Sequence, residues 1–348
     1  MDVSDFDFDL PPDLIAQFPA PSRDDARLLV LDRSRGAWTH AGIRDLPGLL
    51  RPGDLVVLND TRVFPARLLG ARVPSGGAVE CLLTAHLEGE RWEALVHPGQ
   101  KLKPGAIVKF EGNGAGLLAE ILERRFHGRR TIRLWREDGG DVDEAVDRLG
   151  HVPLPPYIKR PDEPVDRERY QTVFARARGS IAAPTAGLHF TADLLAQMDS
   201  LGIERTAVTL HVGYGTFKPV RVERVEDHTV DAEWFAIGED AAAAIRCAKR
   251  EGRRVVAVGT TTTRALESAA RAGDGAVVAT AQQTDLFITP GFRCQVVDAL
   301  VTNFHLPRSS LLVLVSALAG RDLVLAAYRA AVAERYRFYS YGDAMLIL

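Results

Sequence analysis

A strand, a polar turn and the start of a helix follow one another in the stretch Val255-Val256-Ala257-Val258-Gly259-Thr260-Thr261-Thr262-Thr263-Arg264. Four consecutive apolar residues predict a strand that is buried on both faces, as in a sheet covered by helices. The threonine-rich turn predicts a helix that continues to Ala270. The N-terminus of this helix has free N–H groups, which suit an anion or the polar edge of a ligand. A threonine-rich helix cap that binds no ligand has the same sequence. The stretch is not a phosphate loop, because the Gly-Lys-Ser/Thr element is missing.

Helices and strands alternate on both sides of this stretch. Thr191 can cap a helix that runs to Leu201, where Gly202 ends it. Further elements are predicted as strands at 55–58, 206–211, 284–288 and 295–300, and as a helix at 241–251, with the apolar run 310–318 continuing the pattern. This order predicts an α/β domain.

The pattern changes between residues 64 and 151. Short alternating segments, separated by glycine and proline turns, lie at 78–84, 92–96, 106–110, 117–122 and 131–135, and a short helix is predicted at 141–149. Spacing of this kind is typical of a small antiparallel barrel or sandwich. The proline-rich run 151–157 predicts an extended return linker. We therefore expect a discontinuous, barrel-like α/β domain of residues 1–63 and 152–348, with an inserted β-barrel domain of residues 64–151.

Composition limits the classes of function. The chain has 348 residues, a net charge of −3 and three widely spaced cysteines. This charge argues against a protein that coats nucleic acid, but it leaves room for a local basic patch. No metal-ligand spacing occurs, the acidic start lacks the features of a secretory signal, and the longest apolar stretch, 311–319, is too short to span a bilayer. We expect a cytoplasmic protein with no metal and no membrane partner.

Three histidines lie in polar turns that border apolar runs. The turns are 184–191, 209–216 and 301–307, and they hold His189, His211 and His305. Histidine suits proton transfer near neutral pH, and a neighbouring glycine lets the backbone approach a ligand. One such histidine is more often structural, but three predict a shared pocket. The run 213–215 is an isolated GxG, so dinucleotide and methyl-transfer signatures lack support.

Two basic clusters suggest a local contact with RNA. Six arginines lie between residues 124 and 136, close to Phe126 and Trp135. A second cluster surrounds Tyr157 and Tyr170. Such residues can hold phosphates and stack bases, although a solvated charged face explains each cluster equally well. The C-terminal run 336–345 is rich in aromatic residues; these are usually core, but its Tyr-Gly-Asp turn could instead stack a planar base.

Taken together and in this order, seven stretches resemble the S-adenosylmethionine:tRNA ribosyltransferase-isomerase family of queuosine biosynthesis. They are 59–67, 153–158, 182–190, 209–213, 258–261, 298–307 and 339–345. The resemblance implies an α/β domain with an inserted β-barrel. It also implies an activity: the ribosyl part of S-adenosylmethionine is transferred to 7-aminomethyl-7-deazaguanine at the tRNA wobble position and rearranged to epoxyqueuosine, with release of adenine and methionine.

The resemblance also implies the substrates. S-adenosylmethionine is consumed rather than acting as a cofactor, and the partner is a tRNA with a GUN-type anticodon; we expect the chain to act as a monomer. Two other readings stay open at this point. One is an S-adenosylmethionine-using enzyme that acts on a small molecule, and the other is a noncatalytic RNA-binding protein.

The chemistry needs a base for a C5′ proton and an acid for the leaving adenine, and each transfer group contributes about 10²–10⁴-fold. The catalytic candidates are His189, His211, His305 and Asp343. The substrate-binding candidates are Thr185, Gly187, Gly213, Gly215, Thr216, Glu233, Thr260, Thr261, Asp298, Asn303 and Tyr341. The RNA-binding candidates are Arg129, Arg130, Arg133, Lys159 and Arg160.

The stretch after His228 departs from the family pattern. Where the family has Met and His, this chain has Val230 and Asp231. An aspartate has a lower intrinsic pKa than a histidine, so it is a poor replacement for a proton-transfer group. We therefore leave Asp231 out of the catalytic candidates.

Overall fold

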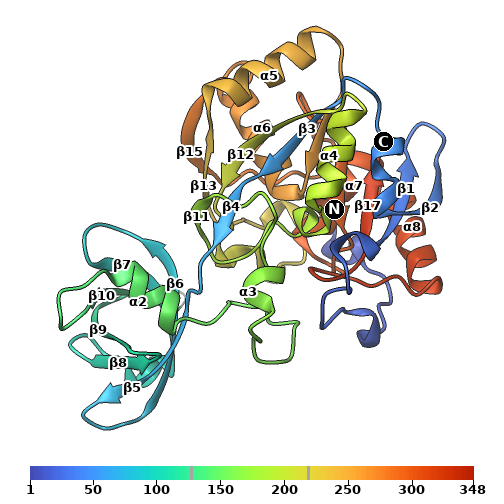
Figure 1. The fold of residues 1–348 in the computed structure, drawn as a ribbon. Helices are drawn as coiled ribbons and strands as arrows, with labels where there is room; N and C mark the ends of the chain where they lie inside the picture. Colours follow the sequence, from blue (N-terminus) through green and yellow to red (C-terminus); the bar gives the residue numbers. More distant parts are fainter. Residues whose placement is uncertain (126–127, 218–219) are drawn as a thin grey trace.

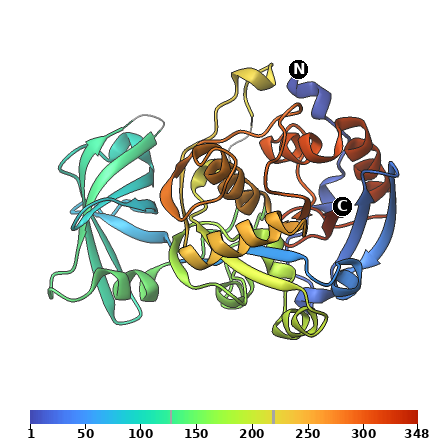
Figure 2. The ribbon, with the colours of Figure 1, turned by 90° about the horizontal axis from the view of Figure 1, so that it is seen from above.

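A small barrel stands beside a larger α/β body in the computed structural model, which describes residues 1–125, 128–217 and 220–348 (Figure 1). The two parts are joined by a narrow neck, and the view from above shows the same separation (Figure 2). The α/β class and the inserted β-barrel predicted from the sequence are confirmed.

The larger body is built on one mixed sheet of nine strands, with β15 and β2 at its two edges. Four neighbouring strands in the middle, β12, β3, β14 and β16, run parallel to one another. In spatial order the strands are β15 (Thr280–Thr284), β13 (Glu233–Ile237), β12 (Glu204–Leu210), β3 (Leu55–Asn59), β14 (Val255–Val258), β16 (Ala299–Asn303), β17 (Ala344–Ile347), β1 (Arg27–Asp32) and β2 (Ala37–Gly42).

Helices cover both faces of this sheet, which explains why its central strands are apolar throughout. In β3, Leu55 and Val57 face one core and Val56 and Leu58 face the other. The first core is closed by α5 (Glu239–Arg250), α6 (Thr260–Ala272), α7 (Ser310–Ala319) and α8 (Arg321–Ala333). The second core is closed by α1 (Leu46–Leu49) and α4 (Ala192–Ser200).

The inserted unit is a closed antiparallel barrel of six strands. They are β5 (Arg67–Val73), β6 (Ala78–His86), β7 (Arg91–His97), β8 (Ile107–Gly112), β9 (Ala115–Arg124) and β10 (Arg129–Trp135). The short helix α2 (Val142–Leu149) places Ala145 and Val146 in the barrel core, and its cap Asp141 accepts from two backbone N–H groups. Five of these strands correspond to the predicted segments; β5 was not predicted, because its burial does not alternate cleanly.

The neck is a two-stranded parallel ribbon of β4 (Thr61–Val63) and β11 (Ala177–Ser180). The chain crosses itself where it enters and leaves the barrel: a Cβ atom on Gly150 would lie 1.9 Å from the carbonyl oxygen of Pro65. A short helix, α3 (Asp166–Arg169), follows the return linker.

Two predicted strands are displaced, for a physical reason that the sequence does not reveal. The predicted strand 295–300 lies at 299–303, because the N–H groups of residues 295–297 donate to the buried carboxylate of Glu267. The predicted strand 284–288 lies at 280–284. There Leu286 donates to the Thr284 hydroxyl and accepts from Arg264, so the backbone leaves the sheet.

Within the described residues, no single helix is long and apolar enough to cross a membrane. The pair α7 and α8 meets the requirement only when both helices are taken together, and it is bent by 115°.

Candidate active site

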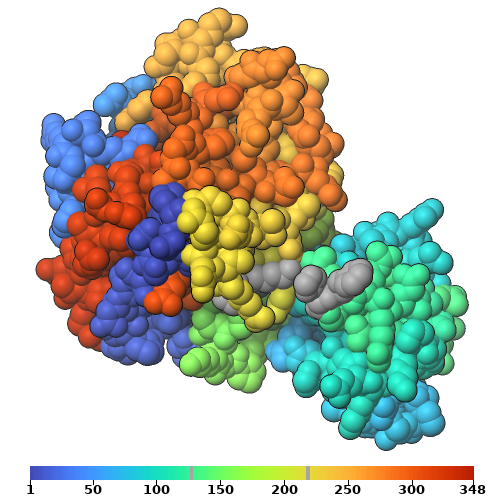
Figure 3. Space-filling view, turned by 180° about the vertical axis from the view of Figure 1, so that it is seen from behind, coloured from blue at the N-terminus to red at the C-terminus, as the bar shows by residue number. Residues whose placement is uncertain are grey.

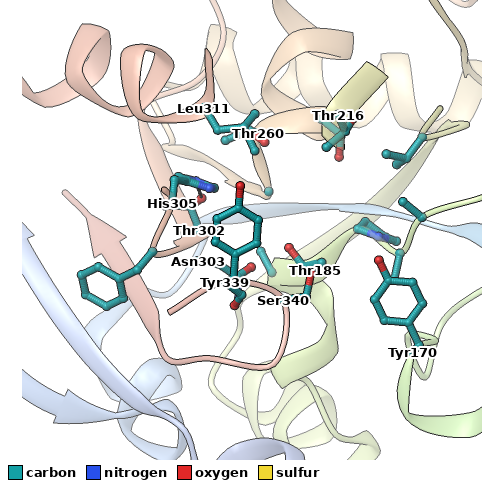
Figure 4. A pocket seen from close by; sticks show the side chains of 18 of the residues that line it. Tyr170, Thr185, Thr216, Thr260, Thr302, Asn303, His305, Leu311, Tyr339 and Ser340 are labelled. Carbon is teal, nitrogen blue, oxygen red and sulfur yellow. Dashed lines mark hydrogen bonds between the residues drawn. The ribbon is translucent and has the colours of Figure 1, made fainter. Parts of the chain in front are cut away.

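A cavity of about 570 Å³ opens at the carboxyl ends of the parallel strands (Figure 4). Its floor is formed by residues at the carboxyl ends of β12, β14 and β16, namely Val212, Gly259, Thr260 and the segment 302–305. Ligands in open α/β sheets bind at this edge, because the loops there converge. Two tyrosines beside the return linker, Tyr157 and Tyr170, form one wall.

The ring of Tyr339 stands in the middle of this first cavity (Figure 4). Its backbone has a φ of +73°, a conformation that a tyrosine rarely adopts. Its ring centroid lies 3.8 Å from that of Tyr157, and the two planes meet at 64°. Sequence reasoning missed Tyr339, although the aromatic run 336–341 was a signal for it.

A second cavity of about 400 Å³ adjoins the first, since Thr216 and Leu311 line both. Its polar side holds a buried ion pair between Glu233 and Arg264. Glu233 also accepts from the backbone N–H of Gly213 at 2.8 Å. The opposite side is apolar and is formed by Leu286, Phe287, Ile288, Leu311 and Leu314.

His305 is the one predicted catalytic residue that lines the first cavity. Its Nε2 lies 2.9 Å from the hydroxyl of Thr302, and its backbone N–H donates to Tyr328. Burial lowers the pKa of His305 to about 3, so the imidazole is uncharged at neutral pH.

His189 lies behind the wall of the cavity, at the end of the 3-10 helix η7 (Thr185–His189). The side-chain amide of Asn303 donates to its Nε2 at 3.1 Å and also to the carbonyl oxygen of Tyr339. Burial lowers the pKa of His189 to about 4. The neutral ring therefore fixes Asn303, which faces the cavity.

His211 lines neither of these two cavities. Its ring stacks on Trp234 with centroids 4.9 Å apart, and its Nδ1 lies 2.8 Å from the hydroxyl of Thr61. Burial lowers its pKa. The ring packs against Gly179 in the neck, where a Cβ atom would approach it to 2.5 Å.

Asp343 is buried away from the two cavities and holds the C-terminal turn together. Its carboxylate accepts from the backbone N–H groups of Arg27 and Arg337 at 2.9 and 2.7 Å, and it pairs with the Arg27 side chain. The structure thus does not bring the four predicted catalytic side chains into one cavity; it places His305 there and the other three around it.

The predicted substrate-binding residues divide in the same way. Those that line one or both cavities are Thr185, Gly215, Thr216, Glu233, Thr260, Thr261 and Asn303. Gly187 packs against Phe174, and Tyr341 donates to the buried carboxylate of Asp166. Gly213 contributes its N–H to Glu233. Asp298 lies at the opposite edge of the sheet, where it pairs with Lys249 and accepts from the N–H of Val255.

The predicted RNA-binding residues of the barrel differ in their ion pairs within the protein and in their exposure to solvent. Arg129 bridges Glu93 of the barrel and Asp231 of the larger body, at 3.2 and 2.7 Å. Arg130 is buried and donates to carbonyl oxygens, one of them that of Gly99. Arg133 is half exposed, pairs with Glu90 and lies over Trp135. Phe126 lies outside the described residues.

A wide groove separates the barrel from the return linker, with a volume of about 1400 Å³. Lys159 and Arg160 line it, and Arg160 forms an ion pair with the buried Asp166. The linings of the groove and the first cavity are neighbours along the chain: Ile158 lines the groove and Tyr157 the cavity, and Tyr214 lines the groove while Thr216 lines the cavity. From behind, the barrel protrudes to one side of the larger body (Figure 3).

Comparisons with known proteins agree over nearly the whole chain. A family model described as a queuosine biosynthesis protein matches residues 3–347. Proteins named S-adenosylmethionine:tRNA ribosyltransferase-isomerase from Heliobacterium modesticaldum and Symbiobacterium thermophilum are 52% and 53% identical, and each match covers 100% of both chains. A crystal structure of S-adenosylmethionine tRNA ribosyltransferase from Thermotoga maritima is 38% identical with a TM-score of 0.56, covering 99% of this chain and 100% of that one.

Proposed function

The chain belongs to the S-adenosylmethionine:tRNA ribosyltransferase-isomerase family of queuosine biosynthesis, and on this premise we propose that the two joined cavities are its active site. S-adenosylmethionine and tRNA are its substrates. The observation that carries the proposal is the junction at Thr216 and Leu311, which makes one bipartite site at the carboxyl edge of the sheet.

S-adenosylmethionine fits this bipartite site by its chemistry. Its methionine part has an apolar chain with charged ends, which suits the second cavity, where apolar side chains face the Glu233–Arg264 pair. The adenosine part then extends into the first cavity, whose lining offers hydroxyl and amide groups. The positive sulfonium would lie near the junction, close to the carboxylates of Glu233 and Asp231.

His305 has the chemical state that a proton acceptor needs. Burial keeps the imidazole neutral, so the ring can accept a proton and carries no charge that would repel the sulfonium. The sulfonium acidifies the C5′ protons of the ribosyl group. We assign to His305 the removal of one of these protons, and to His189 the fixing of Asn303 beside it.

The tRNA would reach the site along the groove beside the return linker. A wobble base lies in a single-stranded loop, so turning it into a pocket costs only about a few kcal/mol. Tyr214 lines this groove, and Tyr157, which follows Pro156 and precedes Ile158 of the groove lining, lines the first cavity. We expect the substrate to be a tRNA with a GUN-type anticodon that carries 7-aminomethyl-7-deazaguanine, and the enzyme to act as a monomer.

A bulky side chain at the junction tests this assignment. In a Leu311→Trp variant the larger ring should obstruct both cavities, so that affinity for S-adenosylmethionine falls at least tenfold while tRNA binding persists. The matched control is Leu201→Trp at the exposed end of α4, which lines neither cavity. Unchanged S-adenosylmethionine binding by Leu311→Trp, in a folded protein, would place the active site elsewhere.

A further inference from the structure

We propose that Tyr339 positions the adenine ring of S-adenosylmethionine by stacking on it, while the side-chain oxygen of Asn303 accepts a hydrogen bond from the adenine amino group. This inference rests on the proposed function, because it takes the bipartite site as the place where S-adenosylmethionine binds. Tyr339 would be a positioning and specificity-determining residue for that reaction.

The backbone of Tyr339 is the first reason. A φ of +73° is unfavourable for a residue with a side chain, and such strain persists only where the surroundings impose it. The imposing contacts are visible: Asn303 donates to the carbonyl oxygen of Tyr339 at 3.1 Å, and the Tyr339 N–H donates to the carbonyl oxygen of Phe304 at 3.0 Å. The strained turn aims the ring into the cavity rather than into the core (Figure 4).

The neighbouring rings show that Tyr339 differs from the other aromatic residues of its segment. Tyr336 and Phe338 are fully buried and pack against Phe304 in the core. Tyr339 instead touches only Tyr157 among the ring pairs of the described residues, and Tyr157 also lines the cavity. The ring of Tyr339 therefore faces the interior of the cavity, and a flat heterocycle that binds there can stack on it.

Asn303 supplies the second, independent reason. Its nitrogen is committed twice, to His189 and to Tyr339, so the orientation of the amide is fixed. Its oxygen is buried and has no hydrogen-bond partner among the residues that the structure describes. A buried unpaired acceptor is unfavourable, and a ligand N–H group would satisfy it. The exocyclic amine of adenine is such a donor.

The depth of the site favours adenine over the tRNA base. Thr302, Asn303 and His305 are all buried, and the cavity continues from them toward the second cavity. A small molecule can occupy this inner part and still reach the second cavity with its methionine chain. A base tethered to a polynucleotide enters from the groove, and its backbone keeps it near the tyrosine wall at the mouth.

The test compares two variants of Tyr339 in S-adenosylmethionine binding without tRNA, measured by calorimetry. Tyr339→Asn removes the ring but keeps a residue that tolerates positive φ, and Tyr339→Phe keeps the ring without the hydroxyl. The loss expected for Tyr339→Asn is about 10- to 100-fold in affinity, the size of one lost base stack. Tyr339→Phe should bind within about twofold of the wild type.

Two further binding measurements show which part of the proposal is wrong if the expected result is not obtained. In wild-type enzyme, S-inosylmethionine, which replaces the adenine amine with oxygen, should bind at least tenfold more weakly; equal binding overturns the role of Asn303. Affinity of Tyr339→Asn for tRNA should be unchanged; a loss for tRNA with none for S-adenosylmethionine overturns the stacking on adenine. If wild-type enzyme binds S-adenosylmethionine but releases no adenine with modified tRNA, the proposed function fails rather than this inference.

Discussion

At the scale of single residues, two buried neutral histidines make the stability of the protein depend on pH. Burial holds the pKa of His189 at about 4 and that of His305 at about 3, against 6.5 for an ordinary histidine. The unfolded chain therefore binds protons that the folded chain rejects once the pH falls below about 6.5. The free energy of unfolding should decrease between pH 6.5 and about pH 4, by roughly 3 kcal/mol for His189.

Urea denaturation at pH 7 and pH 4.5 measures this effect in wild type and His189→Gln. Glutamine keeps an acceptor for Asn303 but does not titrate, so the difference between the two pH values should shrink. His97, which is exposed, provides the control, and His97→Gln should leave the pH dependence unchanged. An equal pH dependence in His189→Gln and wild type would show that this ring is not the group that responds.

The cavity histidine should matter most for turnover. His305→Gln should lower kcat by about 10²–10⁴-fold, the usual contribution of one proton-transfer group. His211→Gln should lower it less, because His211 lines neither cavity. Single-turnover kinetics with saturating substrates would separate these variants, and a larger loss for His211→Gln would reverse the assignment.

The sequence identified the three histidine turns, but it did not show which of the histidines lines the cavity. Asp343 was among the catalytic candidates, since its partners Arg27 and Arg337 are recognised only once the chain has folded. Tyr339 was passed over for Tyr341, because a positive φ at a tyrosine leaves no mark in the sequence. Thr260 and Thr261 were identified because they follow a predicted strand, and Asn303 because it lies in one of the histidine turns; the structure places all three at the carboxyl ends of strands.

At the scale of elements, the crossing of the two connections to the barrel depends on a glycine. A methyl group on Gly150 would meet the backbone oxygen of Pro65 at 1.9 Å, and backbone cannot move aside cheaply. Gly150→Ala should therefore destabilise the protein by about 1–3 kcal/mol. Gly116→Ala, in β9 of the same barrel with no atom within 4 Å of the added methyl, should change stability by no more than about 0.5 kcal/mol. Thermal unfolding of the pair checks this; similar midpoints would mean that the crossing can relax.

The element pattern shows where local sequence suffices and where it does not. The strand 255–258 is as predicted, because four apolar residues specify it locally; the threonines predicted as a turn form the first turn of the helix, which runs from Thr260 to Ala272. The strand β16 begins later than predicted, since the carboxylate of Glu267, some thirty residues away, takes the backbone donors before it. Such a competition between a distant side chain and the sheet has no local signature.

At the scale of the whole molecule, tRNA affinity should depend on the predicted basic residues whose side chains remain accessible to solvent. Lys159 lines the groove and forms no ion pair with any residue that the structure describes, and Arg133 is half exposed. The double variant Arg133→Ala/Lys159→Ala should weaken tRNA binding and flatten the slope of log K against log salt by somewhat less than about two. The exposed Arg35→Ala, on the far β1–β2 hairpin, is the control. A salt slope equal to that of the control would remove both residues from the RNA surface.

Arg129 and Arg130 make contacts within the protein, which the sequence alone could not reveal. Both lie in the run of arginines that suggested RNA binding, yet Arg130 is buried among carbonyl oxygens. Arg129 ties the barrel to Asp231, the residue that departs from the family pattern. Their partners lie elsewhere in the barrel and in the larger body. A run of arginines in the sequence therefore does not show whether each arginine makes a contact within the protein or faces solvent.

The most direct test of the active-site assignment is nucleoside mass spectrometry after incubation with S-adenosylmethionine and tRNA carrying 7-aminomethyl-7-deazaguanine. Wild-type enzyme should convert the base to epoxyqueuosine and release adenine and methionine in equal amounts, only when the modified tRNA is present. Leu311→Trp, which obstructs the two cavities, and His305→Gln should both lose this conversion while still binding tRNA. Full conversion by both variants would contradict the placement of the reaction in the joined cavities.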